Sequence, residues 1–167
     1  MDLFWTIYLD IDRVLHILSG IMWIGLLYYL NFVQVPAFAR MEAAARTNAI
    51  VNLVPRVLLF FRFAALFTVL FGIGYIAGMP FTTDRYFDTP RFYNVAIGGA
   101  LGIIMFLNVW VIIWPNQKKI IAAAREGRAP DPSWGRKALL ASRTNVMLSI
   151  PMLFFMVAAL HLVQLWS

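Results

Sequence analysis

The chain has 167 residues, of which 62% are hydrophobic and only 13% are charged, and its mean hydropathy is +0.75. A water-soluble domain is about half apolar and a quarter charged, so lipid is the expected solvent for this much apolar surface. The net charge of +6 lies in segments between apolar runs, which favours a role in membrane topology and argues against a nucleic-acid partner. The absence of cysteine excludes disulfides, iron–sulfur clusters and covalently attached c-type heme.

Four apolar runs follow one another, at about residues 14–35, 57–79, 94–114 and 144–166. Each holds about 20 residues or more, the length that a helix needs to cross a hydrocarbon core of about 30 Å. We expect the first helix to stop before Pro36 and the third to end at Pro115, because proline cannot continue the hydrogen-bond ladder of a helix. The prediction is an all-α integral membrane four-helix bundle that forms a single domain over residues 1–167.

The segments outside these runs carry helical signals of their own. No signal-peptide pattern precedes the first run, so we expect the first helix to be retained. Residues 37–53 are alanine-rich and amphipathic, which predicts an interfacial helix on the cytoplasmic surface. Residues 116–128 are expected to extend the third helix beyond the bilayer.

Basic residues are distributed unevenly between the two ends of the predicted bundle. Ten of the 14 flank or occupy the first and third connections: Arg40, Arg46, Arg56, Lys118, Lys119, Arg125, Arg128, Arg136, Lys137 and Arg143. The positive-inside rule places those connections in the cytoplasm and both termini on the non-cytoplasmic side of a bacterial inner membrane, as a multi-pass protein. Acidic residues fall on that second side: Asp2, Asp10, Asp12, Asp84 and Asp88. We expect no acid within a span, which argues against a proton pump or secondary transporter.

The two histidines of the chain, His16 and His161, are predicted to reach the same depth. Each lies about five residues inside the same end of the bundle, which is roughly 7–8 Å at a rise of about 1.5 Å per residue. Two imidazoles at one level on two helices are candidate axial ligands for the iron of a b-type heme. The alternative is that both histidines place a polar tip among the lipid headgroups.

Small residues near that level could make room for a macrocycle. They are Ser19 and Gly20 on the first helix, and Gly98 and Gly102 on the third. The spacing Gly98-x-x-x-Gly102 is also a common motif for close helix packing, so these residues could equally bring two helices together.

Several stretches resemble the membrane domain of the bacterial cytochrome-c-linked urate hydroxylases. They are HILSGIMWIGLLYY from His16, NFVQVP from Asn31, NVWVIIWPNQ from Asn108, ASRTN from Ala141 and SIPMLFFM from Ser149. The longer members of that family add a cytochrome c domain whose Cys-x-x-Cys-His attachment site this chain lacks, so the resemblance implies a separate c-type cytochrome as partner. The pattern His16…Trp23-Ile-Gly25 is also similar to heme-binding membrane protoporphyrinogen oxidases, which implies a b-type heme on His16.

These features predict a membrane electron-transfer protein that binds heme b and exchanges electrons with a c-type cytochrome, or within a larger membrane redox complex. A different class of function stays open, that of a cofactor-free accessory subunit of a respiratory or photosynthetic complex. The sequence leaves enzymatic activity undecided, since it offers no base or nucleophile suited to catalysis on urate or a porphyrin.

Overall fold

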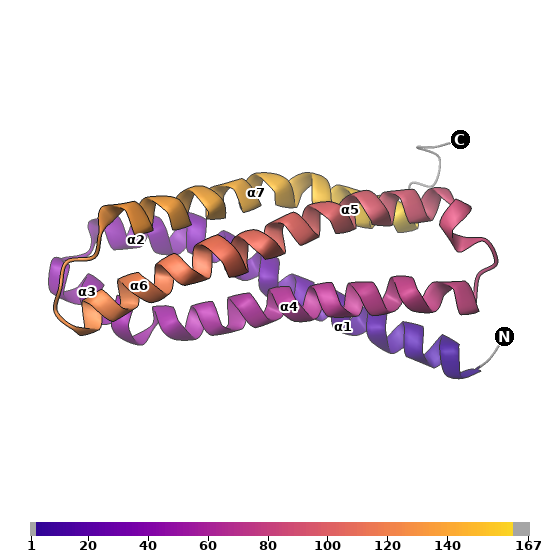
Figure 1. Ribbon diagram of the computed structural model, residues 1–167, viewed down its shortest axis with the longest axis horizontal. Helices are drawn as coiled ribbons and strands as arrows, with labels where there is room; N and C mark the ends of the chain where they lie inside the picture. Colours follow the sequence, from indigo (N-terminus) through magenta and orange to yellow (C-terminus); the bar gives the residue numbers. More distant parts are fainter. Residues whose placement is uncertain (1–2, 162–167) are drawn as a thin grey trace.

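The computed structural model describes residues 3–161, and their side chains over residues 3–158. Within that range the chain is helical and contains no strand. Four helical rods are long and apolar enough to cross a membrane: Leu3–Arg40, Val54–Phe81, Pro90–Arg125 and Pro132–Ala158. The prediction of an all-α protein with four membrane-length helices is therefore confirmed (Figure 1).

The rods are assembled from shorter helical elements. In chain order these are α1 (Leu3–Tyr28), η1 (Tyr29–Gln34), α2 (Val35–Arg40), α3 (Ala43–Asn52), α4 (Val54–Gly78), η2 (Met79–Phe81), η3 (Tyr86–Asp88), α5 (Pro90–Leu107), η4 (Asn108–Ile113), α6 (Trp114–Arg125) and α7 (Pro132–His161). α1 packs along α4, and α5 packs along α7. α1 begins and α7 ends at one end of the bundle, which we call the terminal end, whereas α2 and α3 lie at the other, which we call the basic end (Figure 1).

Two prolines that we expected to end helices lie inside continuous rods, so those expected boundaries were wrong. Pro36 follows the π-helical turns of η1, and Pro115 follows those of η4. The wider π-helical turns accommodate the missing proline N–H. Each proline then occupies the first turn of the next α-helix, where no donor is required.

The connections at the basic end also differ in part from expectation. The single interfacial helix predicted over residues 37–53 is two helices, α2 and α3, because Met41 and Glu42 adopt extended ψ angles of 144° and 150°. The predicted extension of the third helix is confirmed to Arg125, and Gly127 follows with a φ of +68°, which favours glycine at a helix end. The fourth rod begins at Pro132, well before the apolar run that predicted it.

A large apolar core fills the centre and basic end of the bundle. It includes Trp23 and Leu27 from α1, Phe61 from α4, and Met105 and Val109 from the third rod, all at most 1% exposed. Large apolar side chains also point outward from all four rods: Leu18, Ile21, Leu70, Ile73, Ile103, Val111, Met147 and Ile150. Such an apolar outer surface is costly in water and favourable in lipid, which agrees with the membrane assignment.

A belt of buried polar side chains crosses this core and joins three of the rods. The Tyr28 hydroxyl lies 2.9 Å from the Ser149 hydroxyl, and Asn31 Nδ2 donates to Ser142 Oγ at 2.7 Å. Asn108 Nδ2 donates to Asn145 Oδ1 at 2.8 Å, and Asn145 Nδ2 donates to the Met105 carbonyl at 2.9 Å. Because apolar contacts alone do not discriminate strongly between registers, these bonds fix how the first and third rods align with α7.

Candidate functional site

His16 lies on the face of α1 that packs against α4. Its Nδ1 is 2.7 Å from the backbone carbonyl oxygen of Thr68. A carbonyl can only accept a hydrogen bond, so Nδ1 carries a proton, and in the neutral ring Nε2 then keeps its lone pair. Metal-binding histidines are commonly held in this way, with one ring nitrogen donating to a backbone carbonyl and the other free to ligate.

Glycines on α4 allow this close approach. A Cβ atom added to Gly72 would lie 3.0 Å from His16 Cε1, and one added to Gly74 would lie 2.9 Å from the Tyr8 hydroxyl and 3.1 Å from Asp12 Oδ1. Tyr8, Asp12 and His16 are spaced four residues apart and therefore form one stripe of α1. This stripe meets the glycine face of α4, so the two helices lie unusually close at the level of His16.

Asp12 is a buried acid of the first rod that precedes the first predicted span, residues 14–35. Its side chain is only 7% exposed inside the first rod, and Oδ2 has no hydrogen-bond partner among the described residues. From the sequence we expected Asp12 on the non-cytoplasmic side with the other N-terminal acids, because it precedes the long apolar run. The four-residue spacing from His16, together with the glycines of α4, is the signal that would have identified it.

The other predicted site residues divide between two helix interfaces. Gly20 lies at the α1–α4 interface, where an added Cβ would be 3.8 Å from Thr68 Cγ2. Ser19 is half-buried on the same helix. Gly98 lies at the α5–α7 interface, where an added Cβ would be 3.3 Å from the Met152 carbonyl oxygen. Gly98 therefore serves helix packing.

Gly102 and His161 provide the remaining predicted positions. Gly102 is buried, and an added Cβ there would meet nothing within 4 Å, so it leaves space beside α5. His161 is the last residue of α7, and its side chain lies outside the described part of the structure. Both predicted axial heme ligands, His16 and His161, therefore stay predictions.

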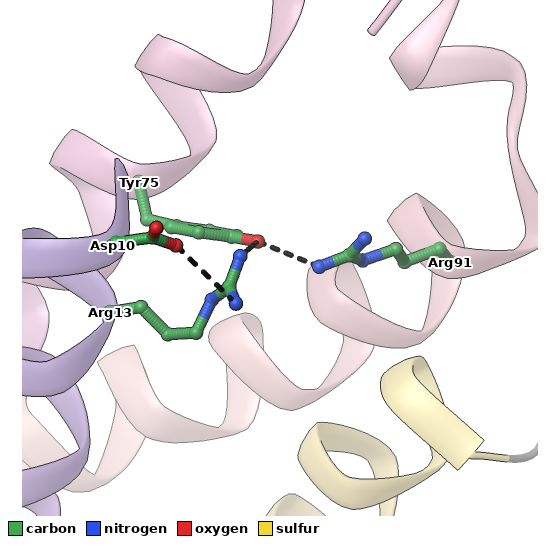
Figure 2. A network of polar contacts seen from close by, with 4 residues as sticks. All are labelled: Asp10, Arg13, Tyr75 and Arg91. Atoms are coloured by element: carbon green, nitrogen blue, oxygen red, sulfur yellow. Dashed lines mark hydrogen bonds and ion pairs between the residues drawn. The ribbon is translucent and has the colours of Figure 1, made fainter. Parts of the chain in front are cut away.

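A second polar cluster lies at the terminal end, one turn before His16 (Figure 2). Arg13 Nη2 and Arg91 Nη2 both donate to the Tyr75 hydroxyl, at 3.0 and 2.7 Å. Asp10 Oδ1 is 3.8 Å from Arg13 Nη1. The cluster joins α1, α4 and the first turn of α5, and sequence analysis did not identify it because its members are distant along the chain.

Arg62 marks the other end of α4. Its guanidinium lies 3.9 Å from the ring centroid of Trp114 and 5.9 Å from that of Trp110. These distances are those of cation–π contacts, which bind the second rod to the third near the basic end.

A family model described as urate oxidase N-terminal matches residues 47–166. The chain belongs to this family. The match confirms the predicted resemblance to the urate hydroxylase membrane domain and spans Gly98, Gly102 and His161, whereas His16 lies before it. It gives no support to the similarity with protoporphyrinogen oxidases. No curated protein and no solved structure matches the chain.

Proposed function

We propose that this urate hydroxylase-related membrane domain is an electron-transfer protein that binds one b-type heme through His16 Nε2. The observation that supports it most directly is the 2.7 Å hydrogen bond from His16 Nδ1 to the Thr68 carbonyl. That bond selects the tautomer a metal ligand needs and holds the ring in one orientation. When bound, such a heme supplies one-electron exchange.

The chain's own residues would hold and shield the cofactor. Gly72 lets the imidazole lie against the α4 backbone, and Thr68 is itself buried with its hydroxyl bonded to the Ala64 carbonyl at 2.7 Å. The backbone segment that orients His16 is therefore rigid. His161, the second ligand we propose, would approach from the end of α7, which lies at the terminal end together with the start of α1 (Figure 1).

The test is a reduced-minus-oxidised absorption spectrum of the full chain purified from its native membrane. We expect b-type bands in the parent protein and their complete loss in His16→Ala, with unchanged helix content by circular dichroism. Gly72→Ala tests whether the position of the His16 ring matters, since its methyl group would meet that ring at 3.0 Å. It should keep heme but shift the absorption bands or the reduction potential. Gly25→Ala, whose added methyl group meets nothing within 4 Å, should keep heme with the bands and the potential of the parent protein.

A colourless parent protein that co-purifies with a larger complex would refute heme binding and support the alternative function, a cofactor-free accessory subunit. The same preparation tests the second ligand. If His161→Ala retains the parent spectrum, then the two-histidine arrangement is wrong even where His16 is required.

We further propose that the terminal end faces away from the cytoplasm of a bacterial inner membrane, where a separate c-type cytochrome would exchange electrons with the heme. The support is the excess of lysine and arginine at the basic end. Alkaline phosphatase fused after the described helix α7 should be active, and the same enzyme fused within residues 126–131 should be inactive. The reverse pattern would place the electron-accepting face in the cytoplasm and exclude this partner.

A further inference from the structure

The polar cluster at the terminal end forms one wall of a cavity of about 200 Å³. Its polar lining comes from three segments: Thr6, Asp10 and Arg13 on α1, Thr82 and Thr83 after η2, and Arg91 on α5. His16 does not line this cavity, although Arg13 precedes His16 by one helical turn. Its lining holds two guanidinium groups and one carboxylate, which leaves a net positive charge.

The two arginines have few partners for their charge: Arg13 lies 5.2 Å from the centroid of the Tyr75 ring and forms one long ion pair, with Asp10. Both donate to the same neutral acceptor, the Tyr75 hydroxyl, so two like charges converge on one oxygen (Figure 2). Asp10 approaches Arg13 only to 3.8 Å, beyond hydrogen-bond distance, and no carboxylate forms an ion pair with Arg91 within the described residues. Asp10, the Tyr75 ring and solvent at the 41% exposed Arg13 side chain offset part of the repulsion between the guanidinium groups, and a net positive charge remains.

Unpaired hydrogen-bond donors of the two arginines also indicate a place for an anion. The Nε atoms of Arg13 and Arg91 are both buried, and within the part of the chain that the structure describes neither has a hydrogen-bond partner. Arg91 also lies in the first turn of α5, an 18-residue helix whose N-terminal N–H groups carry partial positive charge. A basic side chain is disfavoured at that position unless an anion lies nearby.

We propose that this cavity binds an oxyanion, a carboxylate or phosphate group, between the Arg13 and Arg91 guanidinium groups. Guanidinium groups match both oxyanions in geometry as well as charge. Three threonines also line the cavity: Thr6, Thr82 and Thr83. The oxyanion comes either from a small solute on the terminal side or from a lipid headgroup, since the cavity lies at one end of a membrane-length bundle.

The first experiment is calorimetric titration of the full chain in neutral detergent with inorganic phosphate and with malonate. We expect saturable binding, weakened about tenfold or more by Arg13→Gln or by Arg91→Gln. Arg85→Gln is the matched control. Arg85 lies in the connection between η2 and η3, near the cavity-lining Thr83, but its side chain is 85% exposed and pairs with Asp88 at 3.0 Å. Asp10→Asn should strengthen binding, since it removes the competing carboxylate.

The second experiment distinguishes the source of the oxyanion. The chain is reconstituted in mixed phosphatidylcholine and phosphatidylglycerol vesicles, extracted, and analysed by native mass spectrometry for retained lipid. Retained phosphatidylglycerol that is lost in Arg91→Gln identifies a headgroup site, whereas phosphate binding without retained lipid identifies a solute site. If neither anion binds the parent protein, or if both arginine variants bind as the parent does, the proposal is wrong. His16→Ala should bind the oxyanion normally, so this outcome is independent of heme.

Discussion

Replacing Gly74 by leucine is expected to separate α1 from α4 and to lower the free energy of unfolding by about 3 kcal/mol, the upper part of the range for overpacked cores. A Cβ atom at Gly74 would already lie 2.9 Å from the Tyr8 hydroxyl and 3.1 Å from Asp12 Oδ1. The tip of Tyr8 could swing aside for one methyl group, so Gly74→Ala should cost much less. A whole isobutyl group has no such outlet, because Asp12 is itself buried between the helices.

Gly25→Leu is the matched control for this substitution. Gly25 is also a glycine of a membrane-length rod, but it is exposed, and an added Cβ there would meet nothing within 4 Å. Its replacement should change stability by no more than about 0.5 kcal/mol, as is usual for surface positions. Denaturant unfolding in mild detergent, followed by circular dichroism, measures both variants. Equal losses in the two would show that the α1–α4 contact does not cause the effect, because leucine is a better helix former than glycine and propensity alone would stabilise both.

The four rods could be predicted from sequence because their apolar length is a local property. The boundaries at Pro36 and Pro115 could not, because they depend on π-helical turns that accommodate a missing donor. Proline limits only the hydrogen bonds that it would itself make. Whether the chain continues through it depends on the packing of the preceding turns, which no local pattern encodes.

The candidate site was predictable in part for a similar reason. The composition of the chain singles out His16, but its partner is a backbone carbonyl 52 positions away, at Thr68. Any residue type would supply that carbonyl, so sequence carries no signal for it. The cluster of Arg13, Tyr75 and Arg91 was missed because its three members come from three helices, each unremarkable in its own segment.

The stretches that carry the family resemblance supply most of the central polar belt. Asn31 and Asn108 belong to two of them, and Asn145 and Ser149 belong to two more. Polar residues of these stretches therefore set the register of the helices in this chain. The belt can be tested by stability alone, without reference to His16, which begins the first of the stretches, or to the arginine cluster.

Replacing Asn145 by leucine is expected to lower the free energy of unfolding by about 2 kcal/mol. Asn145 is fully buried, and its amide bonds both Asn108 and the Met105 carbonyl. The substitution leaves the buried Met105 carbonyl without its donor and the half-buried Asn108 amide without its acceptor, and a buried unpaired polar group costs about 1–3 kcal/mol. Thr144→Leu, which makes the same polar-to-leucine change at an exposed neighbouring position, should be nearly neutral.

A double-mutant cycle separates the hydrogen bond from the change in volume. If the belt acts through the Asn108–Asn145 bond, then once Asn145 is leucine, replacing Asn108 by leucine removes the unpaired amide and should cost little more. The double variant would then be more stable than the sum of the two single losses predicts, by about 1 kcal/mol. Strict additivity would mean that the two amides act independently, and that packing around η4 rather than this bond aligns the third rod with α7.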